Sequence, residues 1–239
     1  MRTAKEHYEA LLAEIYVWMV GGIDAALALG AQDISALAPG RGLAVDLGAG
    51  FGMHSIPLAQ AGYDVVAIDT SQALLEVLRA NSEGLRIQTV ETDLRRFRSV
   101  VTVPASLVVC LGDTLTHLAS QEDVDRLIDD IGSALAPGGR FVATLRDYTR
   151  LPTGGERFIP VRSDDRRIHT CFLEEQPERV IVHDLVHERQ GAAWRMRVSS
   201  YPKLRLAPDR LAQSLRRVGL QPSITPLQRG MVRVDAALG

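Results

Sequence analysis

The sequence has few cysteines and few aromatic residues. Two cysteines, six histidines and 5% aromatic residues occur among 239 positions. Cys110 and Cys171 are too few and too isolated for a disulfide framework or a zinc motif. His183 and His187 are the only histidines at a ligand-like spacing, but they fall in a strand-like stretch where helical i, i+4 pairing does not apply. We therefore expect no metal ion.

Charge and hydropathy argue against two further classes of protein, those that bind nucleic acid and those that span a membrane. The chain has 27 Lys and Arg against 29 Asp and Glu, a formal net charge of −2, so it lacks a basic field that would attract nucleic acid. No stretch approaches the roughly 18 apolar residues of a membrane-spanning helix. Glu6, Glu9 and Glu14 occupy the place where a signal peptide would be basic. These features predict a cytoplasmic protein without nucleic-acid or membrane partners.

The most informative segment is a glycine-rich octet, Val-Asp-Leu-Gly-Ala-Gly-Phe-Gly, at residues 45–52. It follows an apolar strand, and residues 55–61 behind it are suited to a helix. Gly48, Gly50 and Gly52 lack side chains where the backbone must bend and a ligand must approach it closely. A nucleotide-type cofactor lying over the strand ends suits this arrangement.

The glycine spacing separates candidate cofactors. A turn that binds a dinucleotide has the pattern Gly-x-Gly-x-x-Gly. Here the third glycine, Gly52, comes one residue early, and Met53 stands where the dinucleotide pattern has its third glycine. A P-loop is excluded because no Gly-Lys-Ser/Thr follows. The pattern Asp46-x-Gly48-x-Gly50-x-Gly52 resembles motif I of the class I S-adenosylmethionine-dependent methyltransferases. This resemblance implies S-adenosylmethionine as cofactor and an α/β fold with a doubly wound, seven-stranded, mostly parallel sheet.

Two acids follow the glycine turn. Asp69 ends the short apolar strand expected at residues 63–69, where a carboxylate can accept hydrogen bonds from ribose hydroxyls. Asp93 follows the third expected strand, where family members hold the adenine edge with an acid. The resemblance implies cofactor contacts at Asp46, Gly48, Ala49, Gly50, Asp69, Thr70, Asp93, Leu94, Cys110 and Leu111.

Strands and helices alternate as far as residue 146, as a doubly wound sheet requires. The alternation then stops, and four successive strands are expected at residues 157–162, 168–174, 179–188 and 194–206. Because ligand crevices of such sheets lie at the carboxyl ends of the strands, we interpret this insertion as an antiparallel cover over the site. The expected domains are a helical lid at 1–40, a cofactor-binding domain at 41–150 and 207–239, and the cover at 151–206.

The segment after the fourth expected strand resembles the glycine N-methyltransferase group. Residues 110–114 read Cys-Leu-Gly-Asp-Thr where that group has Cys-Leu-Gly-Asn-Ser, and 145–148 read Leu-Arg-Asp-Tyr where it has His-Arg-Asn-Tyr. The resemblance implies that Arg146 binds a substrate carboxylate, and a guanidinium fork suits this role; an interdomain ion pair is the alternative. Asp113 replaces the family Asn, which favours an acceptor bearing an amine.

Three further residues are candidates for the acceptor site. His117 could serve as a base, although a histidine at a helix start can also be structural. Tyr8 and Tyr16 lie on an expected N-terminal helix and could close over the methyl group about a hinge at Gly21-Gly22. The alternative for this aromatic stripe is core packing.

The sequence thus predicts a methyltransferase acting on the nitrogen of a small molecule, an amino acid or an amine. The alternative is transfer to oxygen or carbon of a specialised metabolite, which Asp113 and His117 as base would favour. Met53 disfavours a nicotinamide-dependent oxidoreductase, and a non-catalytic cofactor-binding module stays open. The sequence leaves the acceptor and the oligomeric state undetermined.

Overall fold

The computed structural model describes residues 4–238. Its main sheet has seven strands in the order β10-β11-β5-β4-β1-β2-β3. β11 runs antiparallel to both of its neighbours, and the remaining pairs are parallel. The doubly wound, mostly parallel sheet expected from the sequence is therefore confirmed. The strands are β1 (Leu43–Leu47), β2 (Asp64–Asp69), β3 (Ile87–Glu91), β4 (Ala105–Cys110), β5 (Leu135–Arg146), β10 (Leu220–Pro226) and β11 (Met231–Leu238).

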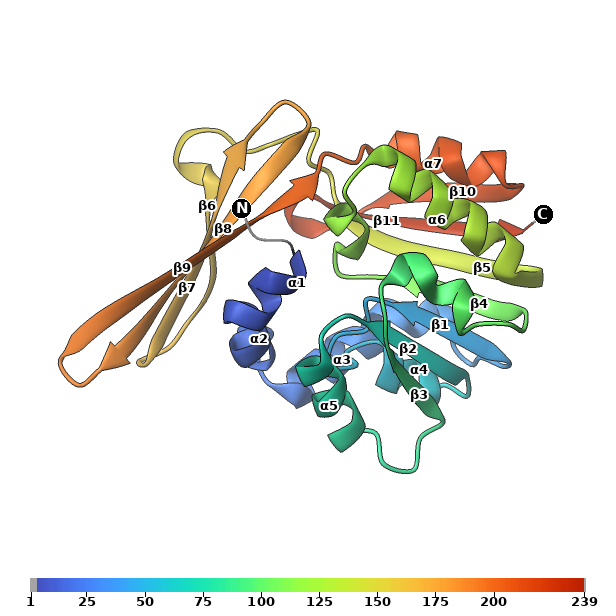
Figure 1. Cartoon of the computed structure of the whole chain (residues 1–239), viewed down its shortest axis with the longest axis horizontal. Helices are drawn as coiled ribbons and strands as arrows, with labels where there is room; N and C mark the ends of the chain where they lie inside the picture. The colour runs from blue at the N-terminus through green and yellow to red at the C-terminus, as the bar shows by residue number, and fades with distance from the viewer. Residues whose placement is uncertain (1–3, 239) are drawn as a thin grey trace.

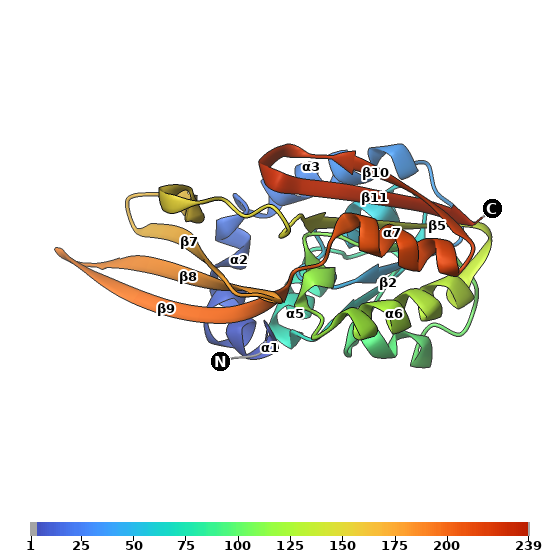
Figure 2. The same cartoon turned by 90° about the horizontal axis from the view of Figure 1, so that it is seen from above.

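Helices cover both faces of this sheet (Figures 1 and 2). One face packs on α3 (Ile23–Ile34), α4 (Ser55–Gln60) and α5 (Gln72–Ala80). The other packs on α6 (Gln121–Ala134) and α7 (Pro208–Arg217). Because β1 and β4 lie in the middle and are buried on both sides, they consist of almost unbroken apolar runs. Short 3-10 turns lie at Ser35–Leu37, Leu94–Ser99, Thr114–His117, Gly154–Arg157 and Gln228–Gly230.

A second, antiparallel sheet occupies the chain between β5 and α7, where the sequence predicts an inserted cover. Its four strands have the order β6-β7-β8-β9, and Figure 1 shows them projecting away from the main sheet as a long twisted arm. The expected antiparallel insertion is confirmed, while the domain limits stay a prediction. The strands are β6 (Phe158–Ser163), β7 (Arg167–Glu175), β8 (Arg179–Gln190) and β9 (Ala193–Leu204).

The N-terminal segment connects the two sheets. It consists of α1 (Ala4–His7), one π-helical turn (Tyr8–Leu12) and α2 (Ala13–Met19). Its Leu11, Leu12 and Ile15 pack against Val186 of β8, and its Tyr16 packs with Phe51 after β1. The segment is thereby held against both the cover sheet and the glycine turn.

Among the helices of residues 4–238, no single one is long and apolar enough to cross a membrane. Ala13–Met19 and Ile23–Leu37 would have sufficient length and apolar character only if taken together, and they are bent by 72° at the break between them.

Gly30 of α3 allows this helix to approach the glycine turn, and its replacement tests that contact. A Cβ atom at Gly30 would lie 1.8 Å from the carbonyl oxygen of Met53. Helix propensity alone predicts that Gly30→Ala stabilises the chain by about 1 kcal/mol. We expect instead a destabilisation of about 1–3 kcal/mol, because the helix must move away from the turn.

Denaturant unfolding measures the free energy of Gly30→Ala, with Gly155→Ala as the control. A Cβ atom at Gly155 would meet no atom within 4 Å, so this variant should unfold as the wild type does. A Gly30→Ala variant at least as stable as the wild type would show that α3 does not need this close approach.

Candidate active site

A cavity of about 340 Å³ lies at the carboxyl ends of the parallel strands. It is bounded by the segments that follow β1, β2, β3 and β4, which is where open α/β sheets bind their ligands. Eleven residues expected from the sequence to form the site line it. They are Tyr8, Tyr16, Gly48, Ala49, Gly50, Asp69, Thr70, Asp93, Leu94, Leu111 and His117.

The glycine turn has the backbone geometry that its sequence requires. Gly48, Gly50 and Gly52 have φ angles of +82°, +54° and +94°. Residues that carry a side chain adopt such positive φ angles only at a cost in energy. A Cβ atom at Gly48 would also lie 2.4 Å from Thr114 Cγ2. At Gly50, by contrast, a Cβ atom would have no neighbour closer than 3.9 Å. The free space at Gly50 belongs to the cavity, so a ligand can contact the backbone there.

Asp69 at the end of β2 holds this turn in place. Its Oδ2 accepts a hydrogen bond of 2.8 Å from Gly50 N, and its Oδ1 accepts one of 2.8 Å from Ser71 N. Burial raises the pKa of Asp69, while these backbone hydrogen bonds oppose the rise. A carboxylate has about four acceptor sites, so Asp69 can still accept hydrogen bonds from a ribose. The residue therefore suits two roles, turn support and ribose binding.

Asp93 also lines the cavity, but its carboxylate is paired. Arg95 Nε and Nη2 donate to its two oxygens at 3.0 and 2.6 Å. These hydrogen bonds lower the pKa of Asp93. A role at the adenine edge stays a prediction, and it would use the acceptor sites that Arg95 leaves.

Two expected cofactor residues lie behind the turn. Asp46 is buried, and Ser55 Oγ donates a hydrogen bond of 2.6 Å to its Oδ2, which connects β1 to the start of α4. Cys110 is fully buried in the core at the end of β4, and burial raises the pKa of its thiol. Neither side chain lines the cavity. Asp46 joins β1 to α4 and Cys110 fills the core, and a cofactor contact by either residue stays a prediction.

The acceptor side of the cavity is aromatic. Tyr8 and Tyr16 have ring centroids 5.7 Å apart, and Tyr8 lies 5.9 Å from the ring of His117. Burial raises the pKa of both tyrosines, so both keep their hydroxyl protons. Tyr201 of β9 stacks on His117 from behind, with centroids 5.4 Å apart.

His117 is the polar group best placed to meet a substrate. Burial lowers its pKa well below the usual range, and the charges of Lys203 and His7 lower it further. The ring is therefore neutral near pH 7. Its buried Nδ1 has no hydrogen-bond partner within residues 4–238. Buried polar atoms without a partner are rare. The ring of His117 also lines the cavity, which favours a role beside the ligand.

Asp113 and Arg146 do not converge with the tyrosines as a shared acceptor site would require. Asp113 has a left-handed φ of 69°, and its carboxylate accepts hydrogen bonds from Arg146 N and Tyr148 Oη at 2.9 Å each. The guanidinium of Arg146 instead donates to the carbonyl oxygen of Arg229 at the surface. Neither residue lines the cavity. The backbone of Arg146, not its side chain, is what meets Asp113.

The sequence reasoning missed Lys203. Its Nζ forms an ion pair with Asp113 Oδ2, and both side chains are almost completely buried. The ion pair connects β9 of the cover sheet to the segment after β4, and it also brings a positive charge near His117. The sequence does offer one signal that singles out Lys203, since it is one of two lysines in a chain rich in arginine. Its partner, 90 residues away, was not predictable.

Removal of Lys203 tests whether Asp113 is a buried structural carboxylate. In Lys203→Met the carboxylate loses its counter-charge inside the protein, so we expect a loss of about 3–5 kcal/mol in the free energy of unfolding. The double variant Asp113→Asn/Lys203→Met should recover a substantial part of the lost free energy of unfolding, because neither member of the buried ion pair remains charged. Denaturant titration of the wild type, of the single variants Lys203→Met and Asp113→Asn and of the double variant gives the coupling energy. Additive effects of the two substitutions would contradict a direct ion pair.

Comparison with known proteins relates part of the chain to methyltransferases. A family model described as a methyltransferase domain matches residues 44–139. A glycine/sarcosine N-methyltransferase of Halorhodospira halochloris is 32% identical over 106 residues, covering 44% of this chain and 40% of that protein. The cypemycin N-terminal methyltransferase of a Streptomyces species is 33% identical over 136 residues, 51% of this chain and 54% of that protein. The chain thus spans about half or less of the length of these curated relatives.

A solved structure supports the same fold over almost the whole chain. CalS10, an amino pentose methyltransferase from Micromonospora echinaspora solved with S-adenosylmethionine bound, superposes with a TM-score of 0.76 at 19% identity, covering 95% of this chain and 97% of that one. The glycine turn and the Asp69 carboxylate suit the same cofactor. Residues 44–139 thus match a methyltransferase domain, and the chain as a whole has the fold of the S-adenosylmethionine-dependent methyltransferases.

Proposed function

We propose that this protein transfers the methyl group of S-adenosylmethionine to the nitrogen of a small-molecule amine. The observation that carries the proposal is the neutral His117, whose ring lines the aromatic end of the cofactor cavity. The related proteins named above include two N-methyltransferases and one that methylates an amino pentose. The activities of these relatives favour nitrogen over oxygen or carbon as the methyl acceptor.

Orientation is the main contribution that the protein can make. The bound cofactor would supply an already electrophilic methyl group, so the reaction needs a neutral amine held in line with it. The neutral ring of His117 at the cavity wall can accept a hydrogen bond from an N–H of the acceptor, which leaves the nitrogen lone pair free to point toward the methyl group. Tyr8 and Tyr16 exclude water, and their ring faces can stabilise a cationic sulfonium.

The charges around the cavity favour an amine without a carboxylate. Among the described residues that line it, Arg95 is the only Lys or Arg, and its guanidinium is bonded to Asp93. Arg146, the residue expected to bind a carboxylate, is bonded to Arg229 instead. The carboxylate of an amino acid such as glycine would meet no unpaired cation among the described residues that line the cavity. We therefore favour an uncharged polar amine, for example an amino sugar, over an amino acid.

A replacement at Gly50 tests the cofactor site. The side chain of Gly50→Val would occupy the space that the cavity offers to the cofactor, so affinity for S-adenosylhomocysteine should fall by more than about 100-fold. Gly84→Val is the matched control: Gly84 also has a positive φ, +76°, but a Cβ atom there meets nothing within 4 Å, and it lies outside the cavity. Calorimetry should show wild-type affinity for this control. Equal affinities of the two variants would place the cofactor elsewhere.

A replacement at His117 tests the acceptor site. His117→Phe keeps a ring against Tyr201 but removes the nitrogen acceptor, so kcat/KM for an amine acceptor should fall by about 10- to 100-fold. Binding of S-adenosylhomocysteine should be unchanged. The acceptor is first found by screening amino sugars, amino acids and phenols with labelled cofactor. Turnover of phenols alone would instead support oxygen methylation.

The pH profile separates an orienting His117 from a titrating base. Because burial holds the pKa of His117 well below its usual range, the ring is not expected to titrate in the range where an ordinary histidine does. The acid limb of kcat/KM should therefore follow the pKa of the acceptor amine, with activity rising as the ammonium loses its proton. A limb near pH 6.5 that disappears in His117→Phe would show that His117 titrates as a base.

A further inference from the structure

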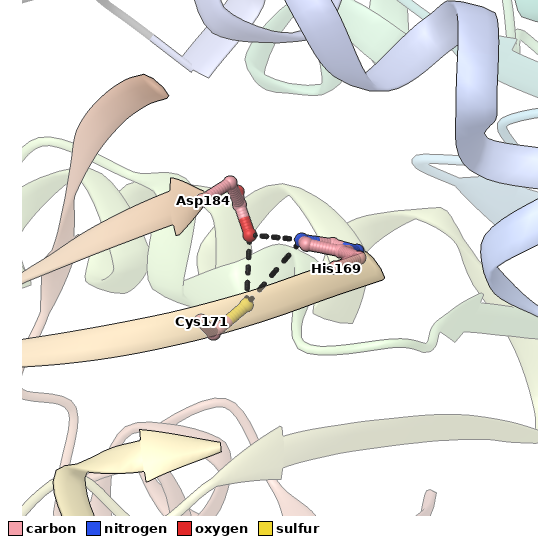
Figure 3. Close-up of side chains that lie close together, drawn as sticks. All are labelled: His169, Cys171 and Asp184. Carbon is pink, nitrogen blue, oxygen red and sulfur yellow. Dashed lines mark hydrogen bonds and ion pairs between the residues drawn. The ribbon is translucent and has the colours of Figure 1, made fainter. Parts of the chain in front are cut away.

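A cluster of metal-ligand side chains lies in the cover sheet, apart from the cofactor cavity. His169 and Cys171 are two residues apart on β7, so both point to the same face of the sheet. Cys171 pairs directly with Asp184 of β8. Figure 3 shows the three side chains converging on one point between the two strands. None of the three lines the cofactor cavity.

The donor atoms are close enough to share one ion. Asp184 Oδ1 lies 2.7 Å from His169 Nε2 and 2.7 Å from Cys171 Sγ, and the latter two atoms are 3.8 Å apart. In a tetrahedral zinc site with bonds of about 2.0–2.3 Å, neighbouring ligand atoms are roughly 3.3–3.6 Å apart. Side-chain movements of less than about 1 Å would therefore open the cluster to that geometry.

The charge and chemistry of the donors also suit zinc. A thiolate, an imidazole and a carboxylate are all common zinc ligands. His169 and Asp184 are only 1% and 2% exposed, so a charged site there must be nearly neutral overall. Zn²⁺ with one thiolate, one carboxylate and one neutral imidazole has zero net charge. On binding, the thiol proton of Cys171 would leave to solvent.

A neighbouring histidine holds the carboxylate from the other side. His7 Nε2 lies 2.8 Å from Asp184 Oδ2, and His7 Nδ1 lies 2.7 Å from Ser199 Oγ. Such outer hydrogen bonds typically orient the ligands of a metal site. His7 belongs to α1, immediately before Tyr8, which lines the cofactor cavity. A metal at this point would therefore fasten the N-terminal segment to the cover sheet.

We propose that His169, Cys171 and Asp184 bind a zinc-like divalent cation, with His7 as the outer support of the Asp184 carboxylate. The cluster escapes sequence analysis, which predicts no metal, because its residues have no motif spacing. They meet only through the register of β7 against β8. The three proposed ligands are distinct from the residues that line the cofactor cavity.

Cobalt spectroscopy on the untagged, chelator-treated chain tests the site. Co²⁺ should bind with one equivalent per chain, produce a thiolate-to-cobalt charge-transfer band, and be displaced by Zn²⁺. Cys171→Ala should lose this band, while Cys110→Ala, a matched truncation of the other cysteine, should keep it. His7→Ala should keep the band but weaken binding by about 10- to 100-fold, as for other outer-support residues.

Absence of a charge-transfer band in the wild-type chain would overturn the proposal, as would a band that survives in Cys171→Ala. In either case the cluster is a hydrogen-bonded network only. Because the variants could be destabilised, X-ray absorption of the zinc-loaded wild-type chain provides a second measurement. One sulfur at about 2.3 Å with nitrogen and oxygen neighbours supports the site, and a shell without sulfur refutes it.

Discussion

The glycine turn after β1 depends on its hydrogen bonds to the end of β2. Gly48 N and Ala49 N donate to the carbonyl oxygen of Ile68, and Gly50 N donates to the carboxylate of Asp69. These contacts keep the turn in a left-handed conformation that only glycine adopts at low cost. The glycine turn then determines the shape of the cofactor cavity and how closely α3 can approach the turn.

A second buried connection places the cover sheet relative to this site. Asp113 accepts hydrogen bonds from the end of β5 and from Tyr148, and it forms an ion pair with Lys203 of β9. Tyr201, two residues before Lys203, stacks on His117. The same connection that joins the two sheets therefore orients the histidine at the acceptor end of the cavity. The positive charge of Lys203 also lowers the pKa of His117 and so helps to keep this histidine neutral.

The fold and the cofactor side of the site were largely predictable from the sequence, because both depend on local patterns. Glycine spacing specifies the turn, apolar runs specify the strands, and an acid at a strand end lies beside the turn in any parallel sheet. The acceptor side was predicted less well. The sequence places Arg146 at the end of β5 but does not reveal that its guanidinium meets the Arg229 carbonyl.

Long-range pairing explains the remaining differences. Asp113 was expected to face the substrate, but its left-handed backbone directs the carboxylate into the protein, toward a lysine far along the chain. The cluster of His169, Cys171 and Asp184 likewise exists only because β7 and β8 pair in one register. Neither arrangement has a short sequence signature, since each depends on which residues meet after folding.

A crystal structure of the protein with S-adenosylhomocysteine tests the central claim most directly. The account predicts that the ligand lies against Gly48–Gly50, with its ribose hydroxyls on Asp69 and its sulfur facing Tyr8, Tyr16 and His117. A ligand bound away from the glycine turn, or with its sulfur directed away from His117, would contradict both the cofactor site and the proposed acceptor position.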